Sequence, residues 1–154
     1  MIKVVISGAK GKMGKAVTEM ISCHDDMKAI AGFDIAYEEG DLVIYDDLYK
    51  IPDTPNVIID FSQPSVIKKL TEYAVAKGTA LAVGTTGLGE EHKEMLLNAS
   101  KSVPVFVSHN MCLGVFLLLS LAKQAAKVLQ DFDIEIVEKH HNQKIDAPSG
   151  TALM

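Results

Sequence analysis

The fold is decided by the N-terminal stretch Ile2-Lys3-Val4-Val5-Ile6-Ser7-Gly8-Ala9-Lys10-Gly11-Lys12-Met13-Gly14. Its first half is a short apolar run that ends at Ser7, which is typical of a strand buried on both faces of a parallel sheet. Three glycines follow, and apolar side chains then recur at positions 13, 16, 17, 20 and 21, the spacing of an amphipathic helix. The stretch therefore predicts a strand, a glycine-rich turn and a helix in succession.

The same alternation of strands and helices continues along the first two thirds of the chain. Alternation at such short spacing is typical of an α/β fold with an open, Rossmann-like parallel sheet and helices on both faces. The acidic segment 35–53 shows neither the helical nor the strand period of apolar residues, so no helix or strand is predicted there. Further strands are expected at 28–34, 56–61, 80–83 and 104–108, and further helices at 64–78 and 88–99.

The pattern changes after residue 109. A long apolar helix is expected over 113–129, a strand with one wet face over 133–139, and a new helix from Ser149. One helix and one strand cannot bury their own apolar faces. We therefore expect a dinucleotide-binding domain over 1–111 and, over 112–154, the beginning of a mixed α+β domain that continues beyond this chain.

Composition excludes several classes of protein. A net charge of −5, aromatic residues at 6% and the absence of Trp argue against a nucleic-acid binder. The most apolar stretch, 111–122, is shorter than the ~20 residues of a membrane span, and the N-terminus does not resemble a signal peptide. Two distant cysteines, Cys23 and Cys112, predict buried thiols rather than a disulfide framework. We expect a cytoplasmic protein.

The glycine-rich turn has the pattern G-x-x-G-x-x-G, formed by Gly8, Gly11 and Gly14. Such glycines permit a tight turn, close approach of the backbone to a pyrophosphate, and close packing of helix on strand. Free N–H groups at the start of the helix attract the phosphate charge. A P-loop is excluded because five residues separate Gly8 from Gly14 and Ala16 follows Lys15.

Asp34 follows Gly14 by 20 residues, at the end of the second predicted strand. A carboxylate at this place binds the ribose hydroxyls of NAD, although an ordinary turn aspartate is the simpler alternative. Lys10 and Lys12 flank the phosphate region and could hold the 2′-phosphate of NADP, or could be solvated surface lysines. The sequence therefore predicts a dinucleotide coenzyme and leaves NAD and NADP open.

The most informative stretch is Glu138-Lys139-His140-His141-Asn142-Gln143-Lys144-Ile145-Asp146-Ala147-Pro148-Ser149-Gly150-Thr151-Ala152. Its histidines can supply a proton near neutral pH, and its lysine can bind a carboxylate. The hydroxyls and N–H groups after Pro148 offer a second carboxylate site, so a small anionic substrate is expected. A zinc site at the two histidines is the alternative, but adjacent strand residues face opposite sides, and we expect no metal.

The whole chain resembles the dihydrodipicolinate reductase family. The stretch 138–152, of the form E-x-H-H-x-x-K-x-D-x-P-S-G-T-A, is its most specific match. The other motifs that carry the resemblance are Gly8-Ala9-x-Gly11-x-Met13-Gly14, Ile59-Asp60-Phe61-Ser62, Gly84-Thr85-Thr86-Gly87 and His109-Asn110-Met111-Cys112-Leu113-Gly114. Two positions depart from the family pattern, His109 where a small residue is usual and Cys112 where Ser or Ala is common, and neither removes a catalytic group.

The resemblance implies NAD(P)H-dependent reduction of a dihydrodipicolinate-type cyclic intermediate to tetrahydrodipicolinate, in lysine and diaminopimelate biosynthesis. It implies that His140 is the general acid, with Lys144 assisting, and that the full-length enzyme is a homotetramer built through its substrate domain. It implies that Lys144, Ser149, Gly150 and Thr151 hold the two carboxylates of the substrate beside His141. The implied coenzyme-binding residues are Gly8, Lys10, Gly11, Lys12, Met13, Gly14, Asp34, Phe61, Gly84, Thr85, Thr86, Asn110 and Met111.

Family members run roughly 100 residues further than this chain. Two alternatives therefore remain beside the reductase. The chain could be a truncated nucleotide-binding module with little catalysis, or part of another small-molecule NAD(P) dehydrogenase on the same fold, which the stretch 138–152 disfavours.

Overall fold

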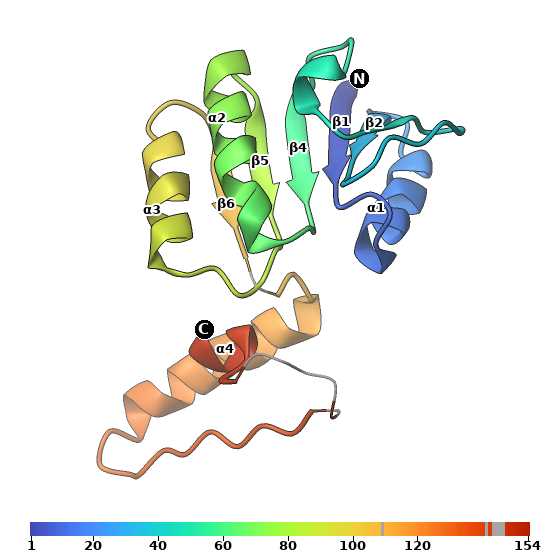
Figure 1. The fold of residues 1–154 in the computed structure, drawn as a ribbon. Helices are drawn as coiled ribbons and strands as arrows, with labels where there is room; N and C mark the ends of the chain where they lie inside the picture. The colour runs from blue at the N-terminus through green and yellow to red at the C-terminus, as the bar shows by residue number, and fades with distance from the viewer. Residues whose placement is uncertain (109, 141, 143–146) are drawn as a thin grey trace. The chain divides into compact units, whose positions relative to one another are not determined.

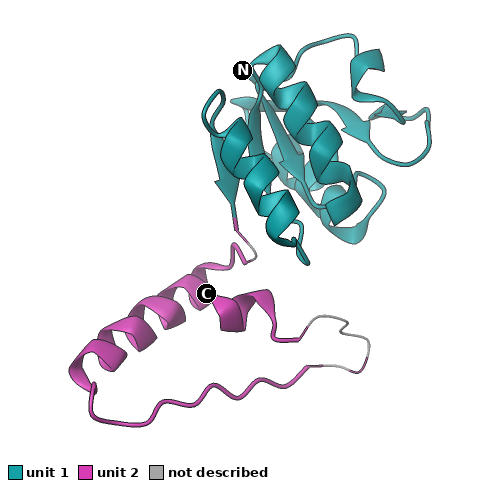
Figure 2. Ribbon diagram, turned by 60° about the vertical axis from the view of Figure 1, so that its left-hand side comes forward, with its two compact units in different colours: residues 1–107 teal, residues 108–154 magenta. Residues whose placement is uncertain are grey.

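The computed structural model describes residues 1–108, 110–140, 142 and 147–154. The chain divides into two compact units, Met1–Val107 and Ser108–Met154, which Figure 2 distinguishes by colour.

Unit 1 is built on a six-stranded parallel sheet (Figure 1), which confirms the predicted Rossmann-like α/β fold. The strand order β3-β2-β1-β4-β5-β6 reverses direction between β1 and β4. Ligands of open α/β sheets bind at such a switch point, outside the carboxyl ends of the strands. The strands are β1 (Ile2–Ser7), β2 (Met27–Phe33), β3 (Ile44–Tyr45), β4 (Val57–Asp60), β5 (Ala80–Val83) and β6 (Val105–Val107).

Helices cover both faces of this sheet, as predicted. Figure 1 shows α1 on one side and α2 with α3 on the other, and two separate buried clusters fill the space beneath them. A left-handed residue, Gly78 (φ +67°), ends α2. The helical elements are α1 (Lys12–Ser22), η1 (Leu48–Lys50), η2 (Pro64–Val66), α2 (Ile67–Lys77) and α3 (Glu90–Ala99).

The buried face of α1 differs from the predicted stripe. Met13 and Met20 are 50% and 64% exposed, whereas Gly14 and Ile21 are buried and Val17 packs against the sheet. Residues 14, 17 and 21 form one row along a helix. This row faces the sheet because Gly14 has no side chain, which lets the helix lie close to the backbone of the glycine turn.

The register between β1 and β2 shifts by one residue in the middle of the pair. Val4 lies opposite Ala29, but Val5 lies opposite Ala31. Ser7 is consequently paired with Phe33, and Asp34 follows immediately at the carboxyl edge of the sheet.

The acidic segment after β2, which showed no pattern in the sequence, folds back on itself. Glu38 and Ile44 exchange two backbone hydrogen bonds of 2.9 and 2.8 Å as an antiparallel bridge. The chain then forms β3 beside β2 and the short helix η1. This arrangement fixes the backbone of Glu38 close to the carboxyl end of β2.

Unit 2 contains α4 (Leu113–Val128) and the short α5 (Gly150–Leu153). The strand predicted at 133–139 is wrong, because these residues form no regular element and the side chains of Ile134, Ile136 and Val137 are exposed. An alternating sequence becomes a strand only beside a partner, and none of the described residues pairs with it. Within the described ranges, no helix is long and apolar enough to cross a membrane.

Both cysteines are free and exposed, so the prediction of buried thiols is wrong. Cys23 follows the end of α1, and Cys112 is the residue before α4. Hydrogen bonds from the backbone N–H groups of Val115 and Gly114 lower the pKa of the Cys112 thiol.

Candidate functional site

The glycine-rich turn has no room for side chains. Gly8 has a φ of +77°, and a Cβ atom there would lie 2.5 Å from the carbonyl oxygen of Phe61. A Cβ atom on Gly14 would lie 2.2 Å from the carbonyl oxygen of Gly8. The Gly8 N–H donates to the Phe33 carbonyl over 2.9 Å, which ties the turn to the end of β2. The glycines therefore leave the backbone of the turn uncovered by side chains at the switch point of the sheet.

A pocket of about 650 Å³ opens beside this turn. The hydroxyl of Ser7 in its wall is fully buried and has no hydrogen-bond partner among the described residues. An orphaned buried hydroxyl beside a glycine turn fits a bound polar molecule in the pocket. Five of the predicted coenzyme residues line it: Gly8, Lys10, Gly11, Asp34 and Phe61. The other lining residues were not among the predicted coenzyme residues: Ser7, Phe33, Ile35, Asp46, Ser62, Gln63, Ser65, Val66 and Lys69.

Asp34 lies at the edge of the pocket with both carboxylate oxygens engaged. One oxygen accepts the Lys10 N–H and the other accepts the Ile35 N–H, each over 2.8 Å. Each oxygen retains a second acceptor position, so the carboxylate can also accept hydroxyl groups of a ligand.

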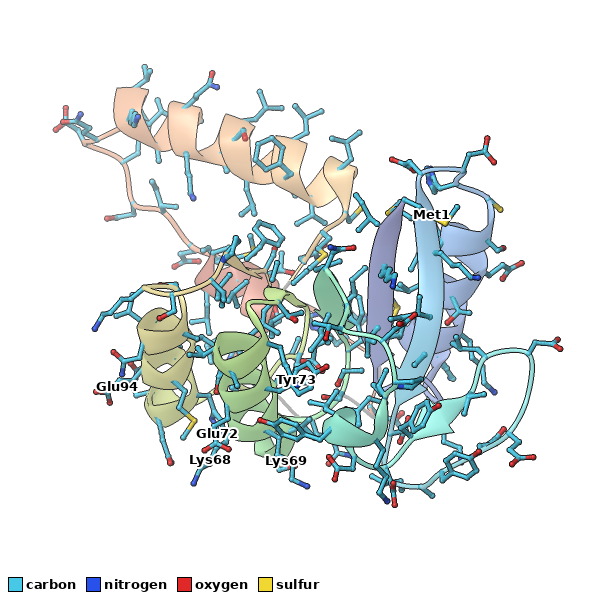
Figure 3. All side chains as sticks on the ribbon, turned by 90° about the horizontal axis from the view of Figure 1, so that it is seen from above. Met1, Lys68, Lys69, Glu72, Tyr73 and Glu94 are labelled. Atoms are coloured by element: carbon cyan, nitrogen blue, oxygen red, sulfur yellow. The ribbon has the colours of Figure 1, made fainter. Side chains whose placement is uncertain are left out.

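The side chain of Lys10 is paired rather than free. Its ammonium lies 2.7 Å from a carboxylate oxygen of Glu38. Sequence reasoning missed Glu38, because the segment that positions it carries no periodic signal. Lys69 of α2, labelled in Figure 3, is a further cation in the pocket wall.

A buried carboxylate joins the ends of β4 and β5. Asp60 is fully buried and accepts the Ser62 hydroxyl over 2.5 Å and the Thr85 hydroxyl over 2.6 Å. The Thr85 hydroxyl in turn accepts the Ser62 N–H over 2.9 Å. A Cβ atom on Gly84 would lie 2.3 Å from the Phe61 ring, so the ring packs directly on this glycine. Asp60 thus ties two predicted coenzyme segments together.

Asp60→Ala should lower the free energy of unfolding by about 2–3 kcal/mol, because the buried Thr85 hydroxyl and the half-buried Ser62 hydroxyl both lose their acceptor. Urea titration followed by circular dichroism measures the change. Asp53→Ala is the matched control, since Asp53 forms only an exposed ion pair of 3.2 Å with Lys3 and should cost less than about 1 kcal/mol. Equal losses in the two variants would contradict the role of the Asp60 network.

In unit 2, a predicted coenzyme residue contacts a predicted substrate residue. The side-chain amide of Asn110 donates to the Thr151 hydroxyl oxygen over 3.0 Å. Its carbonyl oxygen accepts the Cys112 N–H over 2.9 Å. Ser149 is buried and its hydroxyl accepts the Ala152 N–H over 3.1 Å, which caps α5.

His140 lies beside Glu138. The imidazole Nδ1 is 3.7 Å from a carboxylate oxygen of Glu138, and the same carboxylate accepts the Ser149 N–H at 2.9 and 3.3 Å. Glu138 therefore links the histidine segment to the start of α5. The predicted residues His141 and Lys144, and with them the zinc alternative at the histidine pair, lie outside the described residues.

The remaining predicted coenzyme residues lie away from the pocket wall or at the surface. Lys12, Met13 and Thr86 in unit 1 and Met111 in unit 2 are exposed. Within unit 2, Gly150 begins α5.

Comparison with known proteins identifies the same family over both units. The family model for the N-terminus of dihydrodipicolinate reductase matches residues 2–111, and the model for its C-terminus matches residues 114–154. The 4-hydroxy-tetrahydrodipicolinate reductases of Caldanaerobacter subterraneus subsp. tengcongensis and Rickettsia akari are each 46% identical to the chain over 154 residues. The chain spans 61% and 60% of the length of these two relatives.

Solved structures agree with this result. The dipicolinate-bound dihydrodipicolinate reductase from Paenisporosarcina sp. TG-14 matches 99% of the chain and 63% of its own length, with a TM-score of 0.77 and 27% identity. The aspartate dehydrogenase of Thermotoga maritima, at 19% identity and a TM-score of 0.58 over 80% of this chain and 52% of its own, shares the fold. The chain belongs to the dihydrodipicolinate reductase family.

Proposed function

We propose that this chain supplies the coenzyme site and part of the substrate site of a 4-hydroxy-tetrahydrodipicolinate reductase that uses NADH or NADPH. The pocket between the glycine turn and Asp34 carries the proposal. It combines bare backbone at the switch point, an unpaired buried hydroxyl and a carboxylate with spare acceptor capacity. In this proposal residues 1–111 bind the coenzyme and 112–154 belong to the substrate domain.

The coenzyme would supply a hydride to the substrate ring. The turn of Gly8, Gly11 and Gly14 would hold the pyrophosphate by its N–H groups, and Asp34 would accept the ribose hydroxyls. The segments on either side of the Asp60 network would lie along the nicotinamide. They comprise Phe61, Gly84, Thr85 and Thr86. Asn110 and Met111, which belong to unit 2, are proposed as further coenzyme-binding residues.

His140 would donate the proton that completes the reduction, at the ring carbon next to the one that receives the hydride. A histidine is suited to this step because it exchanges protons near neutral pH. The Glu138 carboxylate lies 3.7 Å from the imidazole Nδ1. Lys144, Ser149, Gly150 and Thr151 would hold the two carboxylates of the substrate, with His141 beside them.

The full-length enzyme is proposed to be a cytoplasmic homotetramer. Unit 2 supports the assembly, because α4 presents a row of large apolar side chains that the described residues leave exposed: Leu113, Phe116, Leu117, Leu118 and Leu121. Surfaces of this kind are typical of subunit interfaces.

The test is turnover by the full-length protein that contains this chain. Loss of NADH absorbance with freshly generated 4-hydroxy-tetrahydrodipicolinate should be rapid, and amino acids offered with NAD should give no turnover. Coenzyme binding without turnover of either kind would support a binding module instead. Turnover of an amino acid would support another dehydrogenase.

The ion pair between Lys10 and Glu38 predicts a change in coenzyme preference. Glu38→Gln should tighten NADPH binding by about three- to tenfold and leave NADH within about twofold, because Lys10 is released and a negative charge is removed near Asp34. Fluorescence titration of both coenzymes at two salt concentrations measures this. The gain for NADPH should shrink at high salt.

Glu39→Gln is the matched control for charge. Glu39 hydrogen-bonds Tyr37 rather than a lysine, over 3.2 Å. The Glu39→Gln exchange removes the same charge from the neighbouring position and should leave the ratio of the NADPH and NADH affinities unchanged. An equal gain in both variants would mean that Lys10 takes no part in coenzyme choice.

A further inference from the structure

The hydrogen bonds of Asn110 fix the orientation of its side-chain amide. The Cys112 backbone N–H can only donate, so the atom that faces it at 2.9 Å has to be the carbonyl oxygen. The amide nitrogen consequently faces the Thr151 hydroxyl oxygen, at 3.0 Å. The backbone carbonyl of Asn110 also accepts the Ser108 hydroxyl over 2.8 Å, which holds the residue in place.

This orientation decides what the Thr151 hydroxyl can do. An amide nitrogen has no acceptor capacity, so Thr151 has to accept the bond with its oxygen. Its single hydrogen then points elsewhere. No acceptor for that hydrogen is present among the residues that the structure describes. The hydroxyl is thus prepared to donate to a ligand.

We propose that Asn110 is a positioning residue that turns the Thr151 hydroxyl into a dedicated hydrogen-bond donor for an anionic substrate group. The inference rests on the proposed function, in which Thr151 binds a carboxylate. The inference explains why Thr151 would favour anionic ligands. A hydroxyl that already accepts one hydrogen bond has its hydrogen available for an acceptor such as a carboxylate. A ligand that offers only donors at this position gains less.

Asn110→Asp reverses the polarity of the contact while the side chain keeps its size. Aspartate can still accept the Cys112 N–H, but it has no hydrogen for Thr151 and instead accepts the Thr151 hydroxyl. The hydrogen that was free for the substrate is then consumed. The added charge would also repel a dicarboxylate, so the same exchange has to be made in a Thr151→Val background, where repulsion remains and the hydroxyl is gone.

The experiment measures dipicolinate binding by calorimetry in the full-length protein, together with kcat, KM and NADH affinity. Asn110→Asp should weaken dipicolinate binding and raise KM by at least about tenfold. In the Thr151→Val background the same exchange should cost less than about threefold. Thr151→Ser, which keeps the hydroxyl, should bind dipicolinate nearly as well as the wild type.

Asn110→Ala gives a second measurement that introduces no charge. It removes the donor without creating an acceptor, so Thr151 remains able to donate and the loss should be smaller than that of Asn110→Asp. Equal losses from Asn110→Asp in the two backgrounds would overturn the inference and leave the proposed function standing. A wild-type protein that does not bind dipicolinate would overturn the proposed function and this inference with it.

Discussion

Replacing His140 with glutamine in the full-length enzyme should lower kcat by roughly 10²–10⁴-fold and change KM little. Glutamine has similar size and polarity but cannot give up a proton in the transition state. Steady-state kinetics of the wild type and the variant measures the effect.

His24→Gln is the matched control. His24 is an exposed residue just after α1, in the other unit, so this exchange should leave both parameters unchanged. If His140→Gln kept more than a third of wild-type kcat, the proton would come from another group. His141 would be the first to test, because it belongs to the same sequence motif.

Gly8→Ala should be the most damaging exchange in unit 1. Alanine at a φ of +77° costs about 1–2 kcal/mol, and its Cβ atom would overlap the carbonyl oxygen of Phe61, which cannot move without disturbing β4. Together with the overpacking, we expect a loss of about 3–5 kcal/mol in the free energy of unfolding. NADH binding should be undetectable in a fluorescence titration, because the turn can no longer form.

Gly78→Ala separates strain from overlap. Gly78 has nearly the same backbone conformation, with a φ of +67°, but nothing lies within 4 Å of its added Cβ atom. It should cost only the about 1–2 kcal/mol of strain, and NADH affinity should be unchanged. If the two alanines destabilised the protein equally, the contact between the turn and Phe61 would not matter.

The sequence predicts the architecture of unit 1 well because the relevant signals are local. An apolar run, a glycine turn and a helical period each determine the conformation of a few neighbouring residues, and the parallel sheet follows from their alternation. The same locality limits the prediction of α1. Its period is visible in the sequence, but Gly14, rather than Met13 or Met20, decides which side packs on the sheet.

The residues that were missed depend on contacts between distant segments. Glu38 reaches Lys10 only because the segment around it folds back on Ile44. Asp60 was identified only as part of a family motif and was given no role, because its hydrogen bond with Thr85 joins two segments that are far apart in the sequence. The strand expected at 133–139 failed for the converse reason, since its alternating pattern is real but no described segment pairs with it.

The shift in register between β1 and β2 changes where Asp34 lies at the edge of the sheet without changing its number of residues from the glycine turn. Without it, Asp34 would extend one residue, about 3.3 Å, further past the end of β1, and its side chain would face the opposite side of the sheet. One of the residues between Gly14 and Asp34 is therefore the extra residue of β2 at this shift, and it does not move Asp34 further along the sheet. A related chain with a regular β2 and one residue fewer would present its acidic side chain at the same point. The number of residues between the glycine turn and the acidic residue therefore does not by itself determine where the acidic side chain lies. The register of β2 against β1 also determines it.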